Sequence, residues 1–523
     1  MIINYIFLVI LISSKNVVAV GLDISVVLEL TGSTDLRCQA EINGTKITGI
    51  SRNFLHDWSR EYCAFLGIPY AKPPIGDLRF EPPVRNIINS TYNETIEANG
   101  LKDMCVQKEG LLGHEKTISG KEDCLYLNIY TPMLNSSLNN NNKTYPVMFW
   151  IHGGSFHSGS GTYNLYGPDY LVHEDVILVT FNYRLGVFGF LSAPEWKIYG
   201  NMGLKDQLLA LQWVNENIKA FKGNKSSITL IGESAGAASV HYLMMSNLTK
   251  GLYHRAILQS GSALSPWAIQ FVPEQRFEAL KKYLNISDVN DLRNEKKTSS
   301  AAIIDAALNK VPTPEDLKSD NNLVFNPVVE PENSPNPIVS KNLVKRMYKG
   351  EFPDVNIIYG FNDAEGLLGM LMVNETNDRV IYKMREIGQV IPFLFCNNKT
   401  MNTVVNNTIK DLYEYYNLTY AYEKNYEAYI QLMGDAWILH GMHRTLTAIH
   451  NNNRTAKTYF YRLSNDSYSI FKKFVFTEQY KKELPGVCHT DDLGYLFSMS
   501  KELLCPLHNT IFLYRILYQY KHH

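Results

Sequence analysis

Six short apolar runs are spaced along the chain, and most are rich in β-branched or aromatic residues. They lack the strict alternation of apolar and polar positions that marks a strand with one face in solvent. Continuous apolar runs are typical of strands in a parallel sheet that is covered on both faces. The runs are residues 147–151, 176–180, 228–231, 256–258, 355–359 and 458–461.

One longer segment, residues 204–221, has helical spacing instead. Its apolar side chains recur every three or four positions, as in an amphipathic helix that covers a sheet: Leu204, Leu208, Leu211, Val214 and Ile218. Strands and helices in alternation predict an α/β fold with a large, mostly parallel central sheet covered by helices on both faces. We find no internal repeat and expect a single domain over residues 20–523. Residues 312–337 are proline-rich and are expected to form a surface excursion.

The most informative position in this pattern is Ser234. Residues 232–236 read Gly-Glu-Ser-Ala-Gly, after the apolar run 228–231 and before a run of helix formers. A serine on a tight strand-to-helix turn is accessible to substrate, and the flanking glycines allow the turn without a steric clash. The helix N-terminus behind the serine favours negative charge on a reacting carbonyl oxygen. An ordinary glycine-rich turn can share this motif, so the interpretation of Ser234 as a reactive serine depends on finding its partner residues elsewhere in the chain.

Composition indicates a large core and argues against some partners. Hydrophobic residues make up 45% of the 523 residues, and the formal net charge is −1. No block of basic residues stands out, which argues against nucleic acid as a partner.

The N-terminus begins with a short apolar run at residues 6–12, followed by Val17-Val18-Ala19. The run is too short to span a bilayer, and it predicts a secretory signal peptide over residues 1–19. A buried N-terminal strand is the alternative. No later apolar stretch is long enough for a membrane anchor, so we expect a soluble, secreted (extracellular) protein.

The glycosylation sequons and the cysteines are also compatible with an extracellular protein. Asn-x-Ser/Thr sequons recur along the chain, and the glycosylation candidates are Asn43, Asn89, Asn93, Asn135, Asn374 and Asn417. Seven cysteines are compatible with an oxidising environment, and their odd number leaves at least one thiol unpaired. No Cys-x-x-Cys or zinc-like His/Cys spacing occurs, so we expect no metal site.

Longer motifs identify a family. The chain resembles type-B carboxylesterases, α/β-hydrolases whose family also contains cholinesterases, lipases and adhesion proteins such as neuroligins, and it is most similar to secreted insect-type carboxylesterases. The similarity extends over residues 25–497. The matching segments are residues 65–74 (Phe-Leu-Gly-Ile-Pro-Tyr-Ala-Lys-Pro-Pro), 78–80 (Leu-Arg-Phe), 122–128, 182–186 (Asn-Tyr-Arg-Leu-Gly), 232–237, 259–262 and 489–497. Family members continue further beyond the position of His489, so the domain is expected to be short at its C-terminal end.

This resemblance implies a catalytic triad. A serine hydroxyl is a weak nucleophile at neutral pH and needs an imidazole base, which an acid in turn orients. In the α/β-hydrolase order of Ser, acid and His, the implied residues are Ser234 as nucleophile, Glu365 as acid and His489 as base. Asp363 is the nearby alternative to Glu365.

The resemblance also implies an oxyanion hole after the run 147–151. The amides of Gly154, Ser155 and Ala235 are its expected donors. Ser155 stands where many members have Gly or Ala, so its amide can serve only if the local φ suits a residue with a Cβ. Trp267 falls at the position of an acyl-pocket aromatic, and plain core packing is the alternative. Cys105 and Cys124 match the family's first disulfide, and Arg79 and Glu122 match a structural ion pair.

We therefore expect a serine hydrolase that cleaves carboxylic esters of small lipophilic substrates through an acyl-enzyme, without a cofactor. One alternative is a non-catalytic cholinesterase-like adhesion or binding ectodomain, against which the intact triad argues. A cholinesterase is disfavoured because residues 105–124 hold no Trp for a choline cation. A juvenile-hormone-type esterase is a further alternative, although that group usually has Gln at the position of Glu233.

Overall fold

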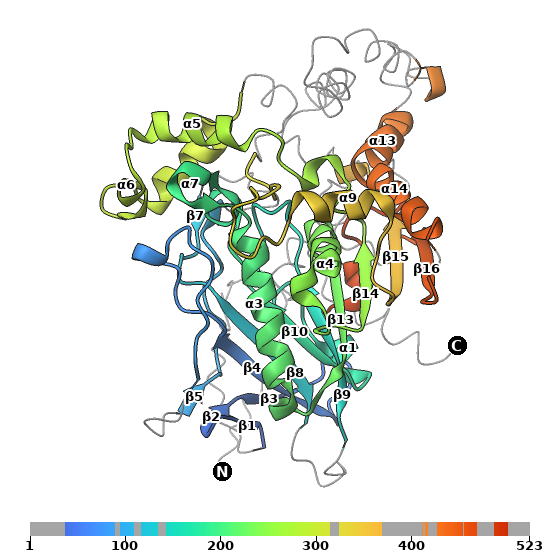
Figure 1. The fold of residues 1–523 in the computed structure, drawn as a ribbon. Coiled ribbons are helices and arrows are strands. Elements are labelled where there is room, and N and C mark those ends of the chain that lie inside the picture. The colour runs from blue at the N-terminus through green and yellow to red at the C-terminus, as the bar shows by residue number, and fades with distance from the viewer. Residues whose placement is uncertain are drawn as a thin grey trace, which may run out of the picture.

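A computed structural model describes residues 37–88, 95–108, 117–133, 143–313, 324–368, 411, 414–416, 426–452, 454–467 and 486–499. Its main feature is a nine-stranded sheet in the order β16-β15-β14-β13-β9-β10-β8-β4-β3 (Figure 1). The strands from β16 to β10 run parallel to one another, whereas β8, β4 and β3 are antiparallel to their neighbours. This is the mostly parallel sheet that the apolar runs predict.

Six of the nine strands correspond to the predicted apolar runs, whereas β3, β4 and β8 precede those runs in the sequence and were not among them. The bounds of the nine strands are β3(Ile50–Asn53), β4(Glu61–Pro69), β8(Tyr126–Pro132), β9(Tyr145–Ile151), β10(Ile177–Phe181), β13(Gly223–Glu233), β14(Arg255–Gln259), β15(Asn356–Asn362) and β16(Thr458–Leu463). Smaller sheets join β1(Gln39–Ile42), β2(Thr45–Thr48) and β5(Thr95–Glu97), β6(Gln107–Lys108) and β7(Ile118–Ser119), and β11(Ser192–Ala193) and β12(Ile198–Tyr199).

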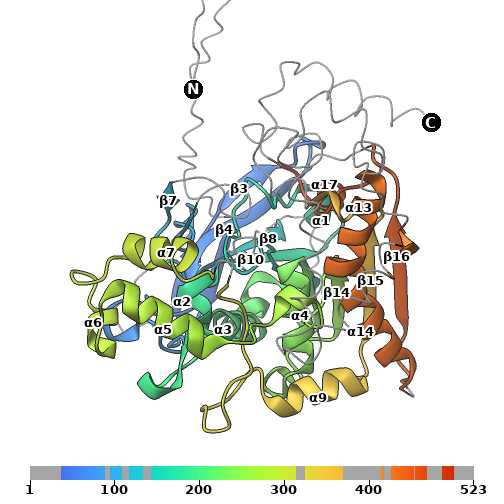
Figure 2. The same ribbon diagram turned by 90° about the horizontal axis from the view of Figure 1, so that it is seen from above.

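Helices cover both faces of the sheet. Figure 2 shows α3(Met202–Asn217) and α4(Ala235–Met245) on one side and α1(Asp169–His173) and α17(Leu493–Leu496) on the other. The predicted helix at 204–221 corresponds to α3 and a short 3₁₀ turn, Ile218–Phe221. The other α-helices within the described residues are α2(Gly186–Phe190), α5(Pro273–Leu284), α6(Val289–Arg293), α7(Ser300–Asn309), α9(Lys341–Lys349), α13(Tyr426–Gly434) and α14(His440–His450).

Two hydrophobic clusters explain why the strands are apolar without alternation. Successive residues of β9 point to opposite faces, so Phe149 belongs to the cluster that also contains Leu211 of α3. Its neighbour Trp150 belongs to the second cluster, with Val172 of α1 and Phe497. Because both faces are buried, consecutive residues of such a strand are mostly apolar.

The prediction for residues 312–337 is wrong in its second half. Val324, Phe325 and Val328 are buried, although this segment has no regular secondary structure. The buried carboxylate of Glu330 satisfies polar groups that the segment would otherwise leave unpaired. It accepts hydrogen bonds from Asn201 Nδ2, Lys205 Nζ, Ser334 Oγ, Ile338 N and Val339 N.

Replacing Glu330 with alanine is expected to lower the free energy of unfolding by about 3–5 kcal/mol, because it leaves the buried Lys205 ammonium without its counter-ion. Urea denaturation followed by circular dichroism measures this loss. Glu332→Ala removes an exposed carboxylate from the same segment and serves as the control. Equal unfolding midpoints for the two variants would contradict this role of Glu330.

Two disulfides lie in the described part of the chain. Cys105 is bonded to Cys124, as the resemblance implies, and Cys38 is bonded to Cys63, a pair that the sequence leaves open. Cys488 is buried and takes part in neither disulfide. The Arg79–Glu122 ion pair is also present, and it holds the carbonyls of Leu292 and Thr298 through Arg79 Nη1.

The predicted signal peptide, Cys396 and Cys505 lie outside the described residues, and so do all the glycosylation candidates except Asn43, which is exposed. Among the described residues, none of the helices has the length and apolar character needed to cross a bilayer.

Candidate active site

Four parallel strands bring the candidate residues to one edge of the sheet. Parallel strands end at the same edge, and ligand sites of α/β sheets form at their carboxyl ends. β9 leads into residues 152–159, which we call the glycine loop, and β13 leads into Ser234. β14 leads into Ser260, and β15 leads into the turn that carries Glu365.

Ser234 lies on a strained turn between β13 and α4. Its φ of 57° is in the left-handed region, and its backbone N–H donates to Gln259 O at 2.8 Å. The turn packs so closely against β9 that a Cβ on Gly236 would lie 2.0 Å from Ile151 O. Glycine is therefore required there, as the motif predicts. The serine itself is 8% exposed, at the N-terminus of a buried helix.

Glu365 and His489 are in direct contact. Glu365 Oε2 lies 2.6 Å from His489 Nδ1, and both side chains are buried. The second carboxylate oxygen, Oε1, accepts hydrogen bonds from Asn362 N at 2.7 Å and Ser260 Oγ at 2.5 Å. Three donors therefore fix this carboxylate in the orientation that holds the imidazole.

The segment of His489 is held against the end of β15. Cys488 pairs with Ala364 in an isolated parallel bridge, and Asn362 Nδ2 donates to Cys488 O at 2.8 Å. Asp363, the alternative acid, accepts from Val487 N at 2.7 Å instead of contacting the imidazole. Asp363 therefore supports the backbone ahead of His489, and the contact with the imidazole belongs to Glu365.

A second carboxylate, that of Glu233, lies near the other imidazole nitrogen. Glu233 Oε1 is 3.1 Å from His489 Nε2, but the geometry is too poor for a hydrogen bond. Burial raises the pKa of the Glu233 carboxyl above its ordinary value. Burial also opposes the charged imidazole, but the carboxylates of Glu233 and Glu365 outweigh this effect and raise the pKa of His489. The imidazole is thus held between two buried carboxyl groups, and each of them, when ionised, favours its charged form.

Glu233→Gln is expected to move the acid limb of kcat/KM to lower pH by about one unit, because it removes one of the charges that raise the pKa of His489. The base works only when neutral, so activity rises as the pH passes upward through the pKa of His489. A pH profile of kcat/KM for both proteins measures the shift. An unchanged acid limb, or a shift to higher pH, would contradict this electrostatic role.

The glycine loop lies directly beside the serine. A Cβ on Gly153 would lie 3.1 Å from Ser234 Cβ. Gly154, Ser155 and Phe156 have φ values of 103°, 54° and 65°, three consecutive residues in the left-handed region. Only glycine adopts such values freely, so Ser155 keeps its amide in the loop at a cost in backbone strain.

Ser155→Gly is expected to leave the free energy of unfolding within about 1 kcal/mol of wild type, because relief of strain is offset by a more flexible unfolded chain. Ser155→Val places a β-branched residue at φ 54° and is expected to cost about 1–2 kcal/mol more. Thermal unfolding ranks the two variants. A valine variant as stable as the glycine variant would contradict the strained backbone.

Trp267 lies close to the glycine loop. Its ring centroid is 6.3 Å from that of Phe156, and its Nε1 donates to Trp437 O at 2.8 Å. The side chain also packs against the main hydrophobic cluster. The acyl-pocket role of Trp267 therefore stays a prediction.

Sequence reasoning did not assign several residues of this site. Ser260 lies within the matched segment 259–262, but its hydroxyl contact with Glu365 depends on the left-handed φ of 54° at Ser260. Asp492, in the matched segment 489–497, is buried and accepts from Gln259 Nε2 at 2.7 Å. Burial raises its pKa. Both segments were recognisable in the sequence, but the contacts within them were not.

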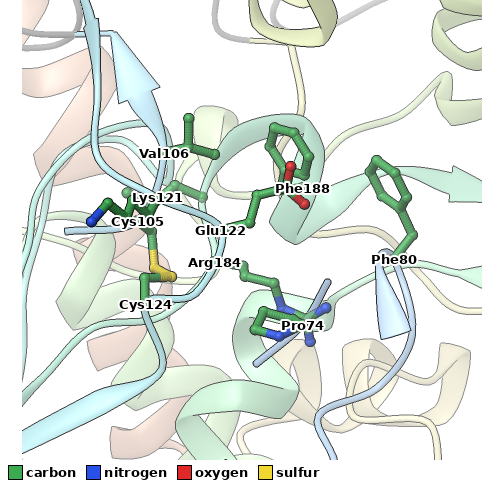
Figure 3. Close-up of a pocket in the computed structure, with 10 residues that line it drawn as sticks. Pro74, Phe80, Cys105, Val106, Lys121, Glu122, Cys124, Arg184 and Phe188 are labelled. Atoms are coloured by element: carbon green, nitrogen blue, oxygen red, sulfur yellow. A yellow bond between two sulfur atoms is a disulfide. The ribbon is translucent and has the colours of Figure 1, made fainter. Parts of the chain in front are cut away.

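A small pocket lies elsewhere, beside the Cys105–Cys124 disulfide (Figure 3). Phe80, Phe188 and Val106 line it together with the charged residues Glu122 and Arg184. These two side chains are already engaged in ion pairs with Arg79 and Asp206. None of the triad candidates lines this pocket, so it is separate from the candidate active site.

Comparison with known proteins identifies the class. The fold is that of an α/β-hydrolase, and it is similar to the crystal structure of the juvenile hormone esterase from Manduca sexta with OTFP covalently attached. That match has a TM-score of 0.73 and 28% identity over 90% of this chain and 86% of that one. A PNB esterase at 24% identity, with a TM-score of 0.65 over 89% and 87% of the two chains, shares the fold.

The family model described as the carboxylesterase family matches residues 38–503, and the chain belongs to this family. Esterase B1 of Culex pipiens is 34% identical over 449 residues, which cover 84% of this chain and 79% of that one. Juvenile hormone esterase of Tribolium castaneum is 32% identical over 464 residues, 84% and 75% of the two chains. The protein is a carboxylic ester hydrolase that acts on small-molecule esters, and the adhesion alternative is set aside.

Proposed function

We propose that this carboxylesterase hydrolyses its substrates through a Ser234–His489–Glu365 triad and an acyl-enzyme intermediate. The observation that carries the proposal is the 2.6 Å contact between Glu365 Oε2 and His489 Nδ1 at the edge of the sheet where Ser234 stands. With Nδ1 donating to the carboxylate, Nε2 is left as the proton acceptor that a serine nucleophile needs.

The reaction then runs in two halves. His489 Nε2 takes the hydroxyl proton while Ser234 Oγ bonds to the ester carbonyl carbon, and the carbonyl oxygen becomes the oxyanion. The amides of Gly154, Ser155 and Ala235 stabilise this oxyanion, each by about 3 kcal/mol. The carbon–oxygen bond to the alcohol breaks, and the alcohol leaves with the proton from His489. Water then repeats these steps on the acyl-enzyme and releases the acid.

Small lipophilic esters are the proposed substrates. The half-buried Trp267 places aromatic surface beside the glycine loop, which suits an apolar acyl group. A hormone-specific esterase is the second candidate, because relatives from Tribolium castaneum and Heliothis virescens carry the name juvenile hormone esterase. Glu233 weighs against it, since that group usually has Gln at this position.

We also propose that the protein is secreted and glycosylated. The signal-like N-terminus, the sequons and two disulfides support this proposal. A similar protein, venom carboxylesterase-6 of Apis mellifera, is 34% identical over 451 residues. A mass decrease on treatment of the insect-cell-secreted protein with an N-glycosidase tests the proposal, and retention of the whole protein inside the cells would contradict it.

A pre-steady-state assay tests the mechanism. Mixing the enzyme with p-nitrophenyl butyrate is expected to give a burst of p-nitrophenolate equal to the enzyme concentration, followed by slower turnover. A panel of p-nitrophenyl esters of increasing acyl length, together with juvenile hormone, separates the two candidate substrate classes by kcat/KM. Turnover of none of these esters by the folded protein would contradict the proposed function.

A further inference from the structure

The glycine loop is tightly closed, and Gly159 is its far end. Gly154 O accepts hydrogen bonds from His157 N at 2.9 Å and Ser158 N at 3.0 Å. Gly159 has a φ of 110°, and a Cβ there would lie 2.5 Å from His152 Nδ1. The end of the loop thus packs directly against its beginning, so the placement of Gly159 determines that of the whole loop.

A side chain from a distant segment binds both backbone groups of Gly159. Gln107 Oε1 accepts from Gly159 N at 2.7 Å, and Gln107 Nε2 donates to Gly159 O at 2.9 Å. The same Nε2 also donates to Cys105 O at 3.0 Å. Gln107 is only 6% exposed, so these bonds are shielded from water. A buried amide with a donor and an acceptor on one residue acts as a two-point clamp.

The segment that carries Gln107 is itself anchored. Cys105, two residues before it, is bonded to Cys124 and pairs with Lys121 in an isolated bridge. Figure 3 shows this disulfide and Val106 together at the wall of the pocket. The segment that carries Gln107 is therefore fixed by a covalent bond two residues away. Through the hydrogen bonds of Gln107, the disulfide supports the glycine loop.

Resting on the proposed function, we propose that Gln107 is a positioning residue for the oxyanion hole. It holds Gly159, and through the closed loop it holds the amides of Gly154 and Ser155 at the place where the oxyanion forms. Displacement of such donors weakens the binding of the transition state more than the binding of the substrate. Only a primary amide of this length supplies both contacts: glutamate at this position keeps the acceptor alone, and methionine keeps neither.

Gln107→Met is expected to lower kcat per active site by about 10–100-fold with KM within about two-fold of wild type. An aliphatic trifluoromethyl ketone, which forms a hemiketal oxyanion with a catalytic serine, is expected to lose affinity by the same factor. Active sites are counted by titration with an organophosphate. Gln107→Glu is expected to show a comparable loss, and it carries the test if the methionine variant does not fold.

Gln207→Met is the matched control. Gln207 is a buried glutamine whose Nε2 donates to Ser239 Oγ at 3.0 Å between α3 and α4. This variant is expected to unfold at a lower temperature while it keeps the kcat per active site and the ketone affinity of wild type. If the Gln107 variants behave like this control, Gln107 is only structural and the inference is overturned. If wild type itself shows neither turnover nor organophosphate labelling, the proposed function fails instead.

Discussion

Replacing Ser234 with alanine is expected to lower kcat for ester hydrolysis by about 10⁶-fold, since the hydroxyl that forms the acyl-enzyme is lost. The rate that remains comes from substrate binding and the oxyanion donors alone. Steady-state hydrolysis of p-nitrophenyl butyrate at high enzyme concentration measures the loss. The substitution replaces a nearly buried hydroxymethyl side chain with a methyl group, so circular dichroism is expected to show an unchanged fold.

His489→Ala supplies the companion experiment. Residues that act as one unit are strongly non-additive, so the double variant of Ser234 and His489 is expected to be no slower than either single variant. Independent, multiplicative losses would show that the two side chains do not act in the same step. A Ser234→Ala variant that retains the wild-type rate would assign the hydrolysis to another part of the protein.

Glu365→Gln is expected to lower kcat by roughly 10⁴-fold, because an amide no longer fixes the imidazole in the tautomer that leaves Nε2 as a base. Glu365 Oε1 already accepts from Asn362 N and Ser260 Oγ, so the amide NH₂ group is forced toward His489 Nδ1. Nδ1 must then accept, and the proton moves to Nε2. Rates of single-turnover acylation measure the effect without interference from deacylation.

Asp363→Asn is the matched control for this variant. Asp363 is two residues from Glu365, but its carboxylate accepts from Val487 N and does not contact the imidazole. An asparagine keeps an oxygen acceptor for that bond, so kcat is expected to stay within about a few-fold of wild type. Equal losses for the two variants would contradict the assignment of Glu365 as the acid.

The sequence predicted the sheet and the chain order of the triad candidates with little ambiguity. Continuous apolar runs are typical of strands in a doubly covered sheet. The strand β9 is such a run because Phe149 and Trp150 pack into hydrophobic clusters on opposite faces of the sheet. The proximity of Glu365 and His489 followed from the resemblance, since parallel strands bring their carboxyl ends together whatever their spacing in the chain.

Contacts that depend on backbone conformation were not predictable. The hydroxyl of Ser260 reaches Glu365 because φ at Ser260 is 54°, and the sequence carries no mark of that value. Gln107 and Gly159 are brought together only by the fold, so no local sequence pattern indicates the hydrogen bond between them. The segment 312–337 was predicted to lie at the surface because it is rich in proline, whereas the carboxylate of Glu330 within it is buried among five donors.

Covalent labelling tests the central claim most directly. An organophosphate such as paraoxon transfers its phosphoryl group to an activated serine and releases p-nitrophenol, so intact-mass spectrometry counts the reactive side chains. We predict one diethylphosphoryl group per chain, mapped to Ser234 by peptide sequencing, with loss of ester hydrolysis in proportion to labelling. Rapid labelling at any other residue, or full labelling with hydrolysis intact, would contradict the account.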